Sequence, residues 1–78
     1  MKQVVLFGAN CGKCKKLELR ILKVIQAEEI VIDFKRTEDL EIMMQHQVHY
    51  LPSVMIDQKV CFQGTIPSGK EMIKVLKN

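Results

Sequence analysis

Two short apolar runs near the start of the chain are separated by one helical segment, and this arrangement constrains the fold more than any other feature. Residues 2–7 (KQVVLF) and 30–35 (IVIDFK) are rich in β-branched and aromatic side chains, which predicts two strands. Between them, from about 13 to 27, apolar residues recur at helical spacing and charged residues fill the opposite face. A strand, a helix and a strand in this order predict a parallel crossover unit, which is right-handed in nearly all cases.

A second helix is predicted within residues 37–47 (TEDLEIMMQHQ). Thr37 or Asp39 is suited to cap its start, because their side-chain oxygens accept hydrogen bonds from the first free N–H groups of a helix. Three apolar residues of this segment are expected to share one face: Leu40, Met43 and Met44.

The last third of the chain predicts a hairpin and a final helix. Residues 53–56 and 59–63 are apolar runs joined by only two residues, which is typical of a β-hairpin. Ser68 and Glu71 then have the spacing of a capping box at a helix start. The element order is β-α-β-α-β-β-α, and we expect one domain over 1–78, a three-layer α/β sandwich around a mixed four-stranded sheet.

Composition and charge exclude several classes of protein. No stretch approaches the ~20 apolar residues of a membrane span, and the first residues lack the apolar core of a signal peptide. We therefore expect a cytoplasmic protein with no membrane contact. The net charge is +3, but three of the four aromatic residues lie in strand-like runs. Nucleic-acid binding is not expected, because such surfaces usually expose aromatic side chains.

Cys11 and Cys14 are separated by two residues, and this spacing suits half of a zinc site, a redox dithiol or two core positions. A structural zinc site needs four ligands. The remaining soft candidates are Cys61, His46 and His49, which form no second pair with the usual spacing, so we expect no metal. Cys61 lies within an apolar run and is expected to be a buried, slow-reacting core residue.

The position of the pair favours the dithiol. The first strand has ended by Gly8, so Cys11 lies where a strand gives way to a helix, close to free N–H groups and the positive end of the helix dipole. Lys13 adds a positive charge nearby, and both effects stabilise the thiolate that attacks disulfides. Cys14 begins the buried stripe one turn later, so we expect it to be less exposed and able to attack a mixed disulfide on Cys11.

Three features together resemble the thioredoxin-like superfamily: the strand VVLF, the motif CGKC opening a helix, and Leu51-Pro52 before the penultimate strand. The resemblance spans the whole chain, and at this length it is similar to the small thioredoxins of archaea and bacteria. It implies that Cys11 is the nucleophile and Cys14 the resolving cysteine. It also implies that Pro52 follows a cis peptide bond beside the thiols and that the backbone of Leu51 binds an extended substrate.

The chain also departs from the pattern of ordinary thioredoxins. Lys13 stands where they have proline, and their buried strand acid falls by alignment on Val5. We expect Lys13 to tune the pKa of the Cys11 thiol downward. Glutaredoxins have a Gly-Gly pair after the hairpin, whereas this chain has only Gly64, so glutathione specificity is not expected.

The resemblance implies a monomeric protein-disulfide reductase that binds no cofactor permanently. Its partners would be disulfide-containing proteins, with a flavin-dependent reductase or another dithiol as electron donor. Two alternatives remain open at this point. One is a module that passes on soft metal or metalloid ions through the same thiols, and the other is a non-catalytic binding domain with a thioredoxin fold.

Overall fold

The computed structural model describes residues 2–8 and 12–77, so Cys11 lies outside the described residues. Three helices pack around a four-stranded sheet with the strand order β2-β1-β3-β4. The elements in chain order are β1 (Lys2–Phe7), α1 (Gly12–Ala27), β2 (Ile32–Thr37), α2 (Leu40–Gln45), β3 (Ser53–Ile56), β4 (Lys59–Gln63) and α3 (Gly69–Lys77). β1 is parallel to β2 and antiparallel to β3, and β3 is antiparallel to β4, which confirms the predicted mixed sheet.

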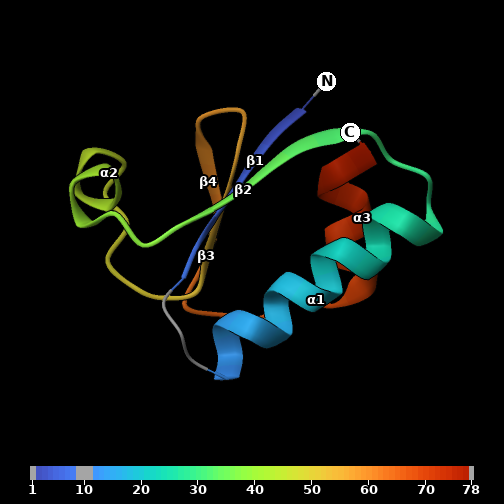
Figure 1. Ribbon diagram of the computed structural model, residues 1–78, viewed down its shortest axis with the longest axis horizontal. Helices are drawn as coiled ribbons and strands as arrows, with labels where there is room; N and C mark the ends of the chain where they lie inside the picture. The colour runs from blue at the N-terminus through green and yellow to red at the C-terminus, as the bar shows by residue number, and fades with distance from the viewer. Residues whose placement is uncertain (1, 9–11, 78) are drawn as a thin grey trace.

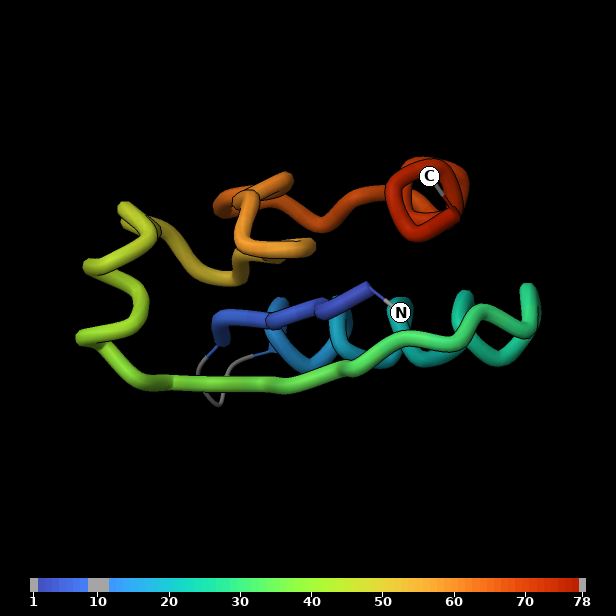
Figure 2. The backbone as a smooth tube through the Cα atoms, turned by 90° about the horizontal axis from the view of Figure 1, so that it is seen from above, coloured from blue at the N-terminus to red at the C-terminus, as the bar shows by residue number. Residues whose placement is uncertain are grey.

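The helices form the two outer layers. Figure 1 shows α1 and α3 on one side of the sheet and α2 on the other. Viewed from above, α2 lies toward the carboxyl ends of β1 and β2, whereas α3 lies toward the opposite end (Figure 2). The predicted three-layer sandwich is therefore confirmed, with one outer layer much shorter than the other. No helix in 2–8 or 12–77 is long and apolar enough to cross a membrane.

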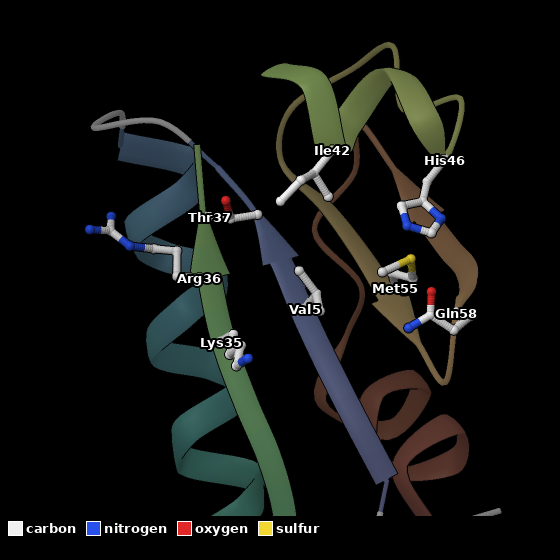
Figure 3. A pocket seen from close by; sticks show the side chains of 8 residues that line it. All are labelled: Val5, Lys35, Arg36, Thr37, Ile42, His46, Met55 and Gln58. Atoms are coloured by element: carbon white, nitrogen blue, oxygen red, sulfur yellow. The ribbon is translucent and has the colours of Figure 1, made fainter. Parts of the chain in front are cut away.

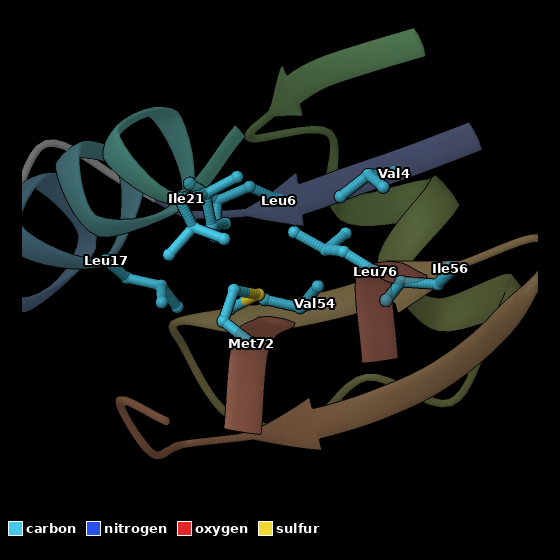
Figure 4. Packing of buried hydrophobic residues seen from close by; sticks show 9 residues of the cluster. Val4, Leu6, Leu17, Ile21, Val54, Ile56, Met72 and Leu76 are labelled. Atoms are coloured by element: carbon cyan, nitrogen blue, oxygen red, sulfur yellow. The ribbon is translucent and has the colours of Figure 1, made fainter. Parts of the chain in front are cut away.

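The larger core lies between the sheet and the pair α1 and α3 (Figure 4). Alternate residues of the two central strands point into it, because successive side chains of a strand face opposite sides of the sheet. Each of the largest of these side chains contributes about 1.5–3 kcal/mol by leaving water. Its fully or nearly fully buried members are Val4, Leu6, Leu17, Ile21, Val24, Val54, Ile56, Met72 and Leu76.

A smaller core lies under α2 and contains Phe7, Met43, Val48 and Met55. Asp39 caps this helix, as predicted: its Oδ1 accepts hydrogen bonds from the N–H groups at 41 and 42, at 2.9 and 3.4 Å. The three apolar residues predicted to share a face differ in burial. Met43 is buried, but Leu40 and Met44 are 68% and 70% exposed, because a helix of six residues covers only one end of the sheet.

The second strand differs from its predicted range of 30–35. Glu29 has a φ of 52°, and the N–H of Ile30 donates to the carbonyl of Ile25 at 3.0 Å, which closes α1 with a Schellman motif. Ile30 therefore belongs to the end of the helix, and Val31 is 77% exposed. β2 starts at Ile32 and continues to Thr37 because all six of its residues pair with β1.

Candidate functional site

Cys14 lies in the first turn of α1 with only 1% of its surface exposed. It begins the buried stripe that continues through Leu17 and Ile21 toward the larger core. The predicted burial of Cys14 is confirmed. The predicted exposure of Cys11 concerns a residue outside the described ranges and stays a prediction.

Gly8 brings the end of β1 into close contact with this thiol. A methyl group on Gly8 would lie 3.0 Å from Cβ and 3.2 Å from Sγ of Cys14, which is closer than side chains normally approach one another. The backbone of Gly8 is held in place, because its N–H donates to the carbonyl of Thr37 at 3.1 Å. A residue without a side chain is therefore required where the strand passes the sulfur.

The electrostatic surroundings of the first turn of α1 are positive. This turn contains no acidic residue, and Lys13, Lys15 and Lys16 are all exposed. The free N–H groups of a helix start and the positive end of its dipole add to this charge. Such surroundings favour a thiolate over a thiol for an exposed cysteine at a helix start.

The Leu51–Pro52 peptide bond is cis, as predicted. Pro52 is fully buried and directly precedes β3, whose first residue, Ser53, pairs with Phe7 in β1. Because Gly8 follows Phe7, Pro52 and the Gly8–Cys14 contact lie at the same end of the sheet. The fold thus brings together Cys14 and the Leu51-Pro52 segment, which are almost 40 residues apart in sequence.

The side-chain amide of Gln63, at the end of β4, fixes the loop that leads to Pro52. Its Oε1 accepts a hydrogen bond from the N–H of His49 at 3.1 Å, and its Nε2 donates to the carbonyl of Gln47 at 3.4 Å. Nothing in the sequence singled out this residue, because a glutamine at a strand end carries no pattern of its own.

Gly64 and Ser53 fix the same loop from its other end. The N–H of Gly64 donates to the carbonyl of Pro52 at 2.8 Å, and the hydroxyl of Ser53 donates to the carbonyl of Tyr50. Gly64 has a φ of 70°, and a methyl group there would lie 3.1 Å from Cβ of Tyr50. The sequence signal was the glycine itself, since a positive φ and a close approach both favour glycine.

The segment before Pro52 offers an exposed surface. Tyr50 is 66% and Leu51 is 39% exposed, next to a buried proline. The backbone N–H and carbonyl of Leu51 make no hydrogen bond within the part of the chain that the structure describes. A backbone N–H and carbonyl of this kind are the groups to which an extended peptide would add as a strand.

Cys61 is exposed, so its predicted place in the core was wrong. In the pairing of β3 with β4, Val54 lies opposite Phe62 but Met55 lies opposite Val60, so Cys61 is the extra residue of a β-bulge. The prediction rested on the apolar run around Cys61, and a bulge residue can point to solvent even within such a run. The thiol makes a weak contact with the carbonyl of Lys59 at 3.6 Å.

His46 and His49 have structural contacts of their own. In 2–8 and 12–77, no group of three or more His, Cys, Asp or Glu side chains is arranged to hold a metal ion. The ring of His46 packs against Phe7 with 6.4 Å between ring centroids. The N–H of His49 is bonded to Gln63, as described above.

A hollow of about 450 Å³ lies beside α2, on the part of that sheet face which the short helix does not cover (Figure 3). Val5 and Met55 lie between Lys35 on β2 and His46 and Gln58 on the far side. Val5, where the resemblance places the buried acid of ordinary thioredoxins, therefore borders a hollow in this chain. None of residues 12–14 or 51–52 lines it, so it is distinct from the site at Cys14.

Comparison with known proteins agrees with this geometry. The sequence profile of the family described as "Thioredoxin domain" matches residues 1–77. The chain is 21% identical to "Thioredoxin" of Methanothermobacter thermautotrophicus over 76 residues, covering 97% of this chain and 99% of that protein. It is 27% identical to "Thioredoxin" of Methanocaldococcus jannaschii over 78 residues, covering 100% of this chain and 90% of that protein.

A solved structure is also similar. Mitochondrial thioredoxin 3 from Saccharomyces cerevisiae, in its oxidised form, superposes with a TM-score of 0.72 at 26% identity. The match covers 97% of this chain and 76% of the yeast chain.

Proposed function

This chain belongs to the thioredoxin domain family, and on that premise we propose that it reduces protein disulfides through the dithiol of Cys11 and Cys14. The observation that carries the proposal is the placement of Cys14. It is buried in the first turn of a helix, against Gly8, at the same sheet end as the cis Leu51–Pro52 bond. Curated relatives named thioredoxin match almost the whole chain, which supports a redox role.

In the proposed reaction, the Cys11 thiolate attacks one sulfur of a substrate disulfide. The substrate S–S bond breaks, and the leaving sulfur takes up a proton. The Cys14 thiol then loses its proton and attacks the sulfur of Cys11, which releases the second substrate thiol and forms a Cys11–Cys14 disulfide. Two electrons pass to the substrate, and a flavin-dependent reductase or another dithiol returns two electrons to the protein.

Two groups have supporting roles in this proposal. Lys13 and the helix start favour the thiolate of Cys11, because both present positive charge to it. The free backbone groups of Leu51 bind the substrate chain beside Pro52 as a short strand. A role in reducing proteins fits a compartment that keeps thiols reduced, such as the cytoplasm.

The reduction of insulin disulfides tests the proposal, with dithiothreitol or a candidate reductase as electron donor. We expect Cys11→Ser to abolish turnover and Cys14→Ser to accumulate a mixed disulfide with the substrate. Cys61→Ser is the matched control, because it removes an exposed thiol away from the motif and should leave the rate unchanged. Full activity of Cys11→Ser would contradict the assignment of the nucleophile.

A further inference from the structure

Helix α1 carries the whole positive excess of the protein. Its basic residues are Lys13, Lys15, Lys16, Arg20 and Lys23, and its only acidic residue is Glu18. The helix therefore has a net charge of +4, whereas the complete chain has +3, so the rest of the chain is net negative by one charge. An uneven distribution of this kind orients a protein toward acidic partners.

Most of this charge is not neutralised by the rest of the protein. Glu18 pairs with Arg36 of β2 at 3.4 Å, on the flank of α1 that faces the sheet edge. In the residues that the structure describes, the lysines of α1 take part in no ion pair. Arg20 donates from Nη1 to the carbonyl of Pro67 at 2.8 Å, which holds the side chain in place but leaves its charge uncompensated.

The lysines surround exposed apolar side chains. Leu19 is 60% and Leu22 is 45% exposed, although α1 has a complete buried stripe on its other side. Besides Gly12 and Gln26, five residues fall within a sector of about 120° opposite that stripe at 3.6 residues per turn. We call them the basic face of α1: Lys15, Lys16, Leu19, Leu22 and Lys23.

The surface is also hollowed beside this face. A depression of about 270 Å³ is lined by Lys16, Leu19, Arg20, Lys23 and Val24. Cationic and apolar side chains therefore line the same depression, which suits an apolar side chain flanked by carboxylates.

The basic face begins next to the thiol site. Lys15 and Lys16 directly follow Cys14, and Lys23 lies about 10 Å further along the helix at a rise of 1.5 Å per residue. A protein whose disulfide reaches the first turn of α1 can therefore contact the basic face as well. Single-stranded nucleic acids stack on exposed aromatic side chains, and α1 has no aromatic residue. Among the described residues, the exposed aromatic side chain is that of Tyr50, which lies outside this helix.

We infer that the basic face of α1 docks protein partners that carry acidic residues around an apolar side chain next to their disulfide. This inference rests on the proposed function, because it names the substrate class of the same thiols. Attraction between complementary charges acts mainly on the rate of association and weakens with salt. We expect a few-fold gain in rate for each complementary charge and roughly tenfold for two.

A single-turnover experiment tests the inference without a reductase. The fully reduced protein is mixed with one of three peptides that share one intramolecular disulfide and one leucine but have flanking residues of Glu, Ser or Lys. The second-order rate constant of disulfide exchange is measured at 20 mM and 500 mM NaCl. We expect the order Glu, Ser, Lys at low salt, with the Glu peptide roughly tenfold faster than the Ser peptide, and similar rates at high salt.

Charge-reversal variants separate the basic face from the net charge. The double variant Lys16→Glu/Lys23→Glu should abolish or reverse the order of the peptides. The matched control Lys35→Glu/Lys59→Glu makes the same change in net charge on strands β2 and β4 and should keep the order. All four lysines are exposed, and Lys16→Gln, which removes a single charge, should lose part of the preference while disturbing the helix least.

The outcomes distinguish this inference from the proposed function. Failure to reduce the Ser peptide would contradict the proposed function itself. Reduction of all three peptides at equal rates, or an order that both double variants leave unchanged, would overturn the docking surface while the function stands. Salt-sensitive binding of a fluorescent oligonucleotide that Lys16→Glu/Lys23→Glu removes, without any peptide preference, would assign the face to nucleic acid instead.

Discussion

Replacing Gly8 by alanine tests the contact between the end of β1 and Cys14. The added methyl group would lie 3.0 Å from Cβ and 3.2 Å from Sγ of Cys14. Cβ belongs to the first turn of α1, and Cys14 is only 1% exposed, so any movement of either atom disturbs packed neighbours. We expect either the first turn of α1 to shift or the sulfur to rotate.

The size of the effect follows from two opposing contributions. Overpacking a close contact costs about 1–3 kcal/mol. Gly8 has no positive φ, so alanine also gains about 0.4–1 kcal/mol by restricting the unfolded chain. The net loss in the free energy of unfolding is about 1–2 kcal/mol, or a decrease in Tm of about 5–15 °C for a domain of this size.

Urea denaturation of the reduced protein measures this loss, and insulin reduction measures its effect on the thiols. Gly69→Ala is the matched control, because a methyl group at Gly69 would meet no atom within 4 Å. The control should be neutral or stabilising by up to about 1 kcal/mol, since alanine favours the helix. If Gly8→Ala unfolds at the urea concentration of the wild type and reduces insulin equally fast, Cys14 is not confined by Gly8 and our reasoning is wrong.

Four further predictions follow from other parts of the structure. Lys13→Pro should lower the reduction potential by a few tens of millivolts, because the charge of Lys13 stabilises the thiolate and only the reduced form carries a thiolate. Equilibration with a glutathione redox buffer measures the potential, and an equal or higher value would contradict the role of Lys13. Gln58→Gly should raise the free energy of unfolding by about 1 kcal/mol in urea, because the φ of Gln58 is 70°. Gln63→Leu should slow insulin reduction and speed amide exchange at His49, because the N–H of His49 loses its acceptor. Unchanged amide exchange would show that Gln63 does not fix the loop before Pro52. Iodoacetamide should label Cys61 of the native reduced protein much faster than Cys14, as peptide mass mapping would show.

Most of the fold was predictable because local patterns and tertiary packing agree. Residues 2–7, 53–56 and 59–63 were predicted as strands with the observed bounds, since each apolar run ends at turn residues. The turn at Asp57 and Gln58 has φ values of 49° and 70°, as a two-residue hairpin with a type I′ turn requires. β2 was misplaced by two residues because apolar Ile30 contributes to a helix end rather than to a strand.

The candidate site was predictable only where it coincides with a motif. Cys14 was identified from the spacing of the cysteines and from helical periodicity, and its burial follows from that periodicity. The contact with Gly8 and the hydrogen bonds of Gln63 depend on the register of strands far apart in sequence, which no local pattern reveals. Cys61 was misassigned for the related reason that a bulge shifts one strand against another without any signature in its residues.

The bulge at Cys61 also bears on how the protein avoids aggregation. A four-stranded open sheet has two edges, here β2 and β4, and unpaired edge groups invite strands of other molecules to add to them. Along β4 the bulge interrupts the regular spacing of the free N–H and carbonyl groups, and an exposed lysine, Lys59, begins the strand. Along β2 the exposed side chains of Asp33, Lys35 and Arg36 place charges where an incoming strand would pack. Neither edge therefore offers a long, flat, apolar template, and the sheet can end at four strands although no further strand pairs with β2 or β4 in the described residues.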